Sequence, residues 1–203
     1  MGALSNILID PLPDIVVVGG EAYEINTNFR TSVLFELMMQ DDSLEARKKT
    51  IKALELYYPV IPNDIHAAVN EIMWFYGCGK SDDPSRKRIH EKRSHERIYS
   101  FEYDDDYIYS AFLTQYDIDL QDIEYLHWWK FRSLFNSLTD NHQFVKIMQY
   151  RSMSISTDLP KEQQKFYSRM KRLYALPKSS SEVQKTEAIE NALMNGGDLT
   201  GLL

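Results

Sequence analysis

The sequence has almost no cysteine. Cys78 is the only one among 203 residues, so an intramolecular disulfide cannot form. A cluster of thiolates that would bind zinc or an iron-sulfur centre is excluded for the same reason. A chain without disulfides fits the reducing cytosol better than an exported state.

Long apolar runs and targeting signals are also missing. No segment approaches the roughly 20 apolar residues that a membrane-spanning helix needs. Residues 1–13 form a short N-terminal lead, in which Asp10, Pro11 and Pro13 interrupt the apolar stretch that a signal peptide requires. Asn6 replaces the usual Ser or Thr of a myristoylation signal. We therefore expect a protein that is neither exported nor inserted in a membrane.

The chain lacks an excess of positive charge. With 23 Lys and Arg against 30 Asp and Glu, the net charge is -7, which disfavours non-specific binding to nucleic-acid phosphates. The main basic concentration lies at 86–97, and acidic residues are interleaved with it. A nucleic-acid-binding regulatory module remains an alternative.

Catalytic and metal-binding motifs are absent from the sequence. Gly19-Gly20 lacks the Lys and Ser/Thr of a phosphate-binding loop. His90 and His95 are five residues apart, which on a helix rotates them about 140° from each other and off a shared metal-binding face. The acidic run 104–106 is better explained by helix capping than by a cation site. We predict no catalytic residues, no metal ligands and no cofactor, and so no enzyme.

The patterns that are present predict a mainly α fold: a multi-helix bundle with an N-terminal β-hairpin and a charged loop in the middle. Residues 15–18 are a β-branched run, Gly19-Gly20 is a turn signal, and 22–25 alternates apolar with polar side chains. From Asn28 onward the apolar period changes to about 3.6 residues, which is typical of helices. Residues 79–98 are almost entirely charged or polar and predict a flexible segment.

Local signals place the helix boundaries. Gly77 marks one helix end. The expected starts are Thr27 or Asn28, Asp42 with Glu45 as a capping box, Pro62, Asp104 or Asp105, Asp140, and Thr157 or Asp158. We expect a single helical domain over 14–176, followed by a tail at 177–203 with one weak helix that carries Val183, Ile189, Ala192 and Leu193.

Two adjacent tryptophans follow His127. Aromatic rings can form a stacking platform for bases or sugars, but Trp128 shares one helical face with Phe131 and Phe135, which favours core packing. Trp129 points to another side of the same helix. We predict that Trp129, with Tyr125 and Lys130, belongs to a partner-binding surface.

Several strings together resemble the bacteriophage gene-product-fifteen family. They occur in family order and spacing between about residues 14 and 175: AYEINTNFR (22–30), YSFEYD (99–104), IYSAF (108–112), YDIDL (116–120), HWWKF (127–131) and MQYR (148–151). The central block is the most specific part, because HWWKF after a YDIDL turn is not a general helical pattern. The last 25 or so residues lie outside the resemblance.

The resemblance implies a non-enzymatic helical protein of the infected bacterial cytoplasm. Family members are similar to tail-assembly chaperones of long-tailed phages and prophages of Gram-positive hosts. Such a chaperone binds the hydrophobic tape-measure protein, and the tail-tube protein is a further expected partner. Several copies per filament-like client would favour self-association. A structural tail or connector component of the virion is the main alternative.

Overall fold

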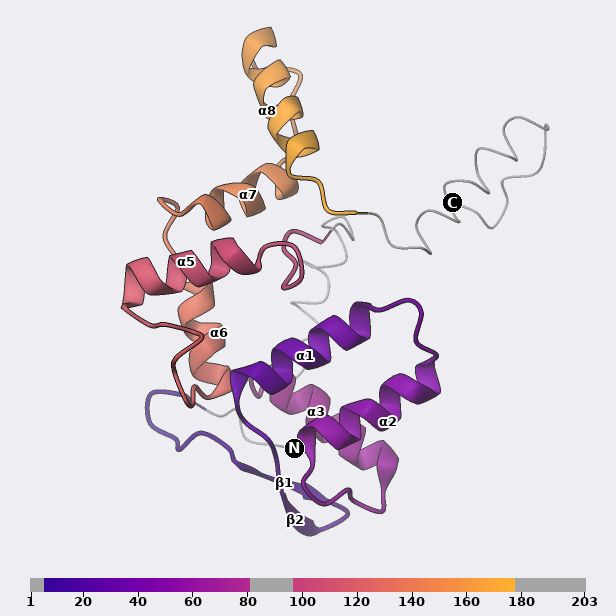
Figure 1. Ribbon diagram of the computed structural model, residues 1–203. Coiled ribbons are helices and arrows are strands. Elements are labelled where there is room, and N and C mark those ends of the chain that lie inside the picture. The colour runs from indigo at the N-terminus through magenta and orange to yellow at the C-terminus, as the bar shows by residue number, and fades with distance from the viewer. Residues whose placement is uncertain (1–5, 81–96, 178–203) are drawn as a thin grey trace, which may run out of the picture.

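The computed structural model describes residues 6–80 and 97–177 (Figure 1). Over these ranges the protein is mainly α with an antiparallel N-terminal hairpin, as the sequence predicts. The helices are α1 (Phe29–Gln40), α2 (Ala46–Tyr57), α3 (Ile65–Tyr76), α5 (Asp105–Tyr116), α6 (Trp128–Asn136), α7 (Gln143–Ser152) and α8 (Lys161–Leu173).

The hairpin consists of β1 (Ile15–Val18) and β2 (Glu21–Glu24). Gly19 and Gly20 have φ angles of 62° and 89°, which suit the tight two-residue turn between antiparallel strands. Val16 and Val18 are buried, and β1 packs against α3. A two-stranded ribbon is marginal alone, so this contact stabilises it.

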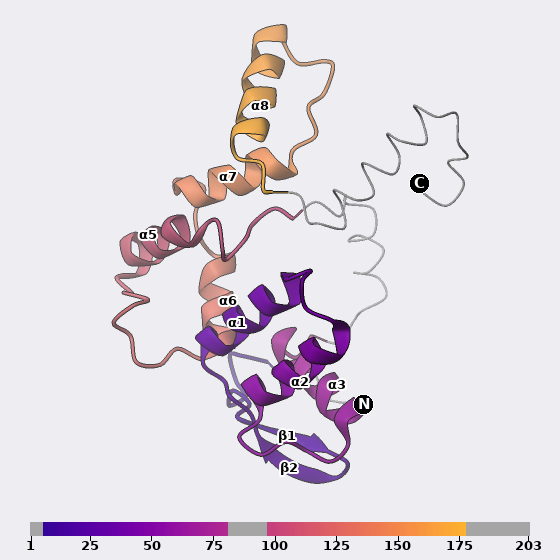
Figure 2. The same ribbon diagram turned by 45° about the vertical axis from the view of Figure 1, so that its right-hand side comes forward.

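The first three helices lie together beside the hairpin, and Figures 1 and 2 show α1 and α2 running antiparallel. α1 buries Phe29, Ser32 and Phe35. Ser32 and Tyr57 of α2 share a buried hydrogen bond of 2.8 Å between their hydroxyl oxygens. Polar and aromatic contacts therefore fix α2 against α1.

The later helices form a second group in which α5 and α7 lie beyond α6, while α8 projects away from the rest of the chain (Figures 1 and 2). Phe131 of α6 connects the two groups. Its ring stacks on Phe29 of α1 and on Phe112 of α5, each with a centroid distance of 4.9 Å. One apolar core therefore crosses both groups.

Several predicted boundaries agree with the structure and several do not. Asn28 caps α1 as predicted, because its side chain accepts a hydrogen bond from the Arg30 N–H at 3.0 Å. The predicted capping box of Asp42 and Glu45 is wrong, since α2 begins at Ala46 without a side-chain cap.

Further differences concern which residue precedes the helix. Pro160, and not Thr157 or Asp158, precedes α8. Asp64, and not Pro62, stands at the start of α3, and its carboxylate accepts from the Ala67 N–H at 3.0 Å. His142 precedes α7 where Asp140 was expected. Polar residues are frequent before each helix, and the chain path decides which one reaches the free N–H groups.

Two predictions lie outside the described residues. The first is the central part of the charged segment at 79–98, including His90 and His95. The second is the weak helix of the C-terminal tail.

Candidate partner-binding groove

Both tryptophans at the start of α6 are buried. Trp128 has 0% of its surface exposed and Trp129 has 3%, so the prediction that Trp129 faces a partner is wrong. The indole N–H of Trp129 donates to the Phe75 carbonyl at 2.8 Å, and that of Trp128 donates to the Tyr76 carbonyl at 2.9 Å. Both carbonyls belong to the last turn of α3, where that of Phe75 also accepts from the Cys78 N–H at 3.0 Å. Two adjacent side chains in the first turn of α6 are therefore buried, and both contact the end of α3.

The starts of α1 and α6 are paired with each other. The Phe29 N–H donates to the Leu126 carbonyl at 2.9 Å, and the Trp128 N–H donates to the Thr27 carbonyl at 2.8 Å. This antiparallel bridge between Asn28 and His127 explains why both helices begin where they do. It also fixes the direction in which the tryptophans enter the core.

His127 caps α6 in its neutral form. Its Nδ1 accepts from the Trp129 N–H at 3.0 Å, which leaves Nε2 to donate to the Pro13 carbonyl at 3.2 Å. Burial lowers the pKa of His127 below its ordinary value. Protonation would place a donor on Nδ1 and break the cap.

Mild acid is therefore expected to destabilise the fold through His127. Because the folded-state pKa is lowered, the unfolded chain binds the proton more readily, and stability is lost as the pH falls below about 6.5. Denaturant unfolding at pH of about 7.5 and 5.5 should show a larger loss for the natural protein than for His127→Asn, whose amide oxygen can still cap the helix. An equal pH dependence in the two proteins would contradict this role.

Tyr125 and Lys130, the other predicted partner-binding residues, are exposed. The Tyr125 ring has 54% of its surface exposed, and its hydroxyl lies 2.7 Å from the Thr27 hydroxyl. Their exposure is compatible with a partner, and their binding role stays a prediction. Trp129 does not join them on that surface.

An open groove lies instead beside α1 and α2. It has a volume of about 700 Å³ and continues into a hollow of about 370 Å³ that shares Leu34, Met38 and Lys52 with it. The lining of the larger part comes from α1, the turn that follows it, α2 and two distant segments: Leu34, Leu37, Met38, Gln40, Asp41, Asp42, Ser43, Leu44, Lys52, Arg97, Glu102, Tyr103 and Pro177. Sequence reasoning missed this site.

The groove exists because α1 is apolar on two sides. Phe29 and Phe35 point into the core, while Leu34, Leu37 and Met38 recur at helical spacing on a neighbouring face. Leu34 keeps 53% of its surface exposed. A second apolar stripe on a helix that is already packed was the available sequence signal for this site.

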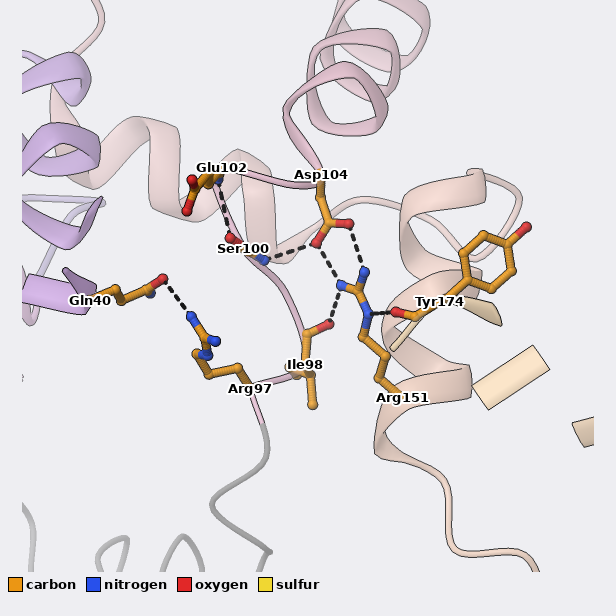
Figure 3. Close-up of polar contacts among 8 residues, drawn as sticks. All are labelled: Gln40, Arg97, Ile98, Ser100, Glu102, Asp104, Arg151 and Tyr174. Atoms are coloured by element: carbon orange, nitrogen blue, oxygen red, sulfur yellow. Dashed lines mark hydrogen bonds and ion pairs between the residues drawn. The ribbon is translucent and has the colours of Figure 1, made fainter. Parts of the chain in front are cut away.

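A polar network holds the far wall of the groove. The Gln40 side-chain oxygen Oε1 accepts from the Arg97 guanidinium at 3.2 Å, and the same guanidinium donates to the Pro177 backbone carbonyl at 3.0 Å. Figure 3 shows the Arg97 and Gln40 side chains pointing toward each other. The Glu36 carboxylate of α1 accepts from the side-chain amide of Gln40 at 3.2 Å. The wall therefore joins residues far apart in the sequence.

Glu36 continues this network beneath the groove. It accepts hydrogen bonds from the hydroxyls of Tyr76 and Tyr99. Burial, assisted by the Glu36 charge, raises the pKa of Tyr76 and of Tyr99, so both phenols keep their protons and act as donors. Arg132 of α6 donates to the Tyr99 hydroxyl at 3.2 Å. Hydrogen bonds thus tie α1 to α3 and α6.

Arg151 organises the base of α8. Its guanidinium makes a bidentate ion pair with Asp104, with N–O distances of 2.6 and 2.9 Å, and also donates to the carbonyls of Ile98 and Tyr174 (Figure 3). Asp104 was predicted as a helix cap. It is the residue before α5, but its carboxylate accepts from Arg151 and from the Ser100 N–H and makes no capping hydrogen bond within α5.

The part of the chain that the structure describes has one thiol and no candidate metal site. Residues 6–80 and 97–177 contain no group of three or more His, Cys, Asp or Glu side chains placed to hold a metal ion. Burial raises the pKa of the Cys78 thiol, which makes it a poor nucleophile. Within the same ranges, every helix is too short or too polar to cross a bilayer.

These features define a mainly α protein with an N-terminal hairpin and an open, partly apolar groove. Residues 8–176 match the family model described as "Bacteriophage Gp15 protein". The chain belongs to this family, and the resemblance found in the sequence is confirmed. Neither the curated proteins nor the solved structures contain a significant match.

Proposed function

We propose that this phage protein acts in tail assembly as a chaperone, and that its α1–α2 groove binds an apolar helix of the tape-measure protein in the host cytoplasm. The observation that carries the proposal is an apolar row along an open groove in a phage protein, made of the exposed Leu34 and the partly buried Leu37 and Met38. The role requires binding and no catalysis. The tail-tube protein is a further proposed partner.

The dimensions of the groove suit a helix. α1 has 12 residues and is about 18 Å long, which accommodates three turns of a bound helix. Leucine and methionine side chains along one wall fit the i, i+3 or i+4, i+7 anchors of an amphipathic client. The unbranched Met38 adapts to different anchors.

Charged residues surround the apolar part of the groove. Lys52, Glu55, Asp41, Glu102 and Arg97 supply both signs around the leucine row. Such a rim pairs with the polar flanks of an amphipathic helix while the centre covers its apolar stripe. Covering that stripe removes the surface that causes aggregation.

Leu34→Lys is expected to abolish the ability of the protein to keep a co-expressed tape-measure protein soluble. The substitution places a charge at one end of the apolar row but leaves the core face of α1 intact, because Leu34 is already half exposed. One measurement is the fraction of tape-measure protein in the soluble lysate, which should fall to the level seen without this protein. The other is the affinity of the variant for the client, which should weaken at least about tenfold, a loss of about 1.4 kcal/mol.

Met73→Lys is the matched control, since Met73 is 52% exposed on α3 and does not line the groove. It should preserve client solubility. If Leu34→Lys and Met73→Lys behave alike, the groove is not the client site. If the natural protein leaves the client insoluble and is recovered in purified phage particles, the structural tail or connector role replaces the chaperone role.

A further inference from the structure

The helix α8 carries a strong positive charge on a negatively charged protein. Lys161–Leu173 contains five Lys and Arg residues against one Glu, whereas the whole chain has a net charge of -7. Lys161, Lys165, Arg169 and Arg172 follow one another at helical spacing and are all exposed. They form a basic stripe along one face of α8.

The rest of α8 holds the stripe away from the body of the protein. Phe166 packs edge-on against Tyr150 of α7 at 6.3 Å, and Tyr174 stacks on the same ring at 6.1 Å. The Arg151 guanidinium fixes the Tyr174 carbonyl at 2.6 Å. No residue of α8 is buried, and both views show it projecting outward. A helix with so little of its own burial is typical of an element that binds a partner.

The same chain contains a surface of opposite charge. Residues 98–129 include eight Asp and Glu and no Lys or Arg. Six of the eight are exposed, whereas Asp104 is buried against Arg151 and Asp119 is partly buried. On α5, Asp106, Ser110 and Leu113 recur at helical spacing, and Asp117 follows as the residue that caps the C-terminal end of the helix. All four are exposed, and they form one stripe with a carboxylate at each end. Both stripes span 11 residue steps, or about 16 Å.

We infer that the basic stripe of α8 in one copy of this protein docks along the acidic α5 stripe of a second copy. The two stripes match in length and are opposite in charge, and Leu113 contributes an apolar contact at the centre. Within one molecule α7 lies between α5 and α8 in both views, so the stripes do not meet there. The contact joins two different surfaces, and each copy therefore offers a free stripe to the next.

A protein partner fits α8 better than nucleic acid does. A nucleic-acid backbone near α8 would also meet the field of the acidic segment and of the negative net charge. With a second copy as the partner, the acidic segment of one molecule is itself the surface that α8 of the other molecule binds. The inference does not depend on the α1–α2 groove, so it can fail while the proposed chaperone function holds.

Sedimentation of the complete natural protein over a concentration series tests the inference. At about 50 mM salt the average mass should rise above twice the 23.8 kDa of one chain, and at about 500 mM salt it should return to that of one chain. A protein that sediments as a monomer in every condition would overturn the inference, and so would a closed dimer that does not respond to salt.

Two complementary variants make the test specific. Lys165→Glu/Arg169→Glu disables the basic stripe, and Asp106→Lys/Asp117→Asn disables the acidic one. Asn is chosen at position 117 because Asp117 has a φ of 55°, which Asn tolerates. Each variant alone should be monomeric. An equimolar mixture should form heterodimers and stop there, because each variant keeps one working stripe.

The control is Arg47→Glu/Lys48→Glu on the exposed side of α2, which changes the net charge as much as the basic-stripe variant does. It should associate like the natural protein. Monomers in the mixture, or equal loss of association in the control, would reject the paired-stripe contact. A third outcome would assign α8 to nucleic acid instead. In that outcome the natural protein does not self-associate but binds a DNA duplex in a salt-sensitive way, and only Lys165→Glu/Arg169→Glu abolishes the binding.

Discussion

Trp129→Ala should lower the free energy of unfolding by about 3–5 kcal/mol, as much as Trp128→Ala. Trp129 loses contacts with Trp74 at a centroid distance of 5.6 Å and with Phe75 at 6.0 Å. It also loses the hydrogen bond to the Phe75 carbonyl. Trp128 loses its stacking on Tyr76 and Phe131. Both substitutions leave a cavity where α6 meets α3.

Denaturant unfolding of the two alanine variants beside Tyr125→Ala measures this effect. Tyr125 is more than half exposed, so its replacement should cost far less than either tryptophan. Trp129→Phe should fall between the natural protein and Trp129→Ala, because it keeps an aromatic ring and loses the indole N–H. A Trp129→Ala protein as stable as the natural one would show that this indole does not support the core.

The tryptophans illustrate what helical periodicity can and cannot predict. The 3.6-residue period correctly assigned Trp128, Phe131 and Phe135 to the core, because these residues share one face. Adjacent residues point about 100° apart, so Trp129 was assigned to the opposite environment. The end of α3 and the Cys78-Gly79 turn cover that second side. The covering segment lies about 50 residues away in the sequence. Helical periodicity describes only neighbouring residues, so it cannot predict such a contact.

Gly79 shows how closely that turn approaches. A methyl group added at its Cα would lie 2.7 Å from the Trp129 ring, and its φ of 68° favours glycine. In the sequence Gly79 reads as the beginning of the charged segment 79–98. Its actual role depends on a tertiary contact, and so the sequence indicated only the start of a flexible segment.

The fold class was predictable because it depends on local signals and not on contacts between distant segments. The hairpin depends on local turn chemistry at Gly19-Gly20, and each helix depends on its own apolar repeat. These signals lie within a few residues of one another. The start of α2 was harder, because Asp41, and not Asp42, accepts from the Ser43 N–H at 2.9 Å and turns the chain there. Neighbouring aspartates give the same local signal.

The groove could not be predicted because its lining is assembled from separated segments. Leu34 and Met38 come from α1, Lys52 from α2, and Tyr103 and Pro177 from the second half of the chain. The sequence shows Leu34, Leu37 and Met38 only as part of one apolar helix. Which of the apolar faces stays open depends on where α2 and residues 97–103 pack.

Arg151→Met is expected to lower the free energy of unfolding by about 3–5 kcal/mol, because it leaves the Asp104 carboxylate buried without its counter-charge. Asp104 is 1% exposed in its side chain, and the Ser100 N–H at 2.9 Å is the other donor that the structure gives it. The same substitution frees the Ile98 and Tyr174 carbonyls. The base of α8 should therefore loosen, and amide hydrogen exchange in α8 should speed up more than in α1.

The double variant Asp104→Leu/Arg151→Met separates the cost of an unpaired charge from the value of the pair. It removes both charges, so it should be more stable than Arg151→Met, although two residues are changed.

The surface pair Lys165–Glu162, in which the side chains are 75% and 86% exposed, provides the comparison. Lys165→Met should leave the free energy of unfolding nearly unchanged. The buried charge is not what makes Arg151 necessary if Arg151→Met is as stable as Lys165→Met. The same conclusion follows if the double variant loses more free energy of unfolding than Asp104→Leu and Arg151→Met lose in sum. In the expected case, the Arg151 guanidinium holds α5, α7 and α8 together, and it supports the outward direction of the basic stripe beside the packing of Phe166 and Tyr174 on Tyr150.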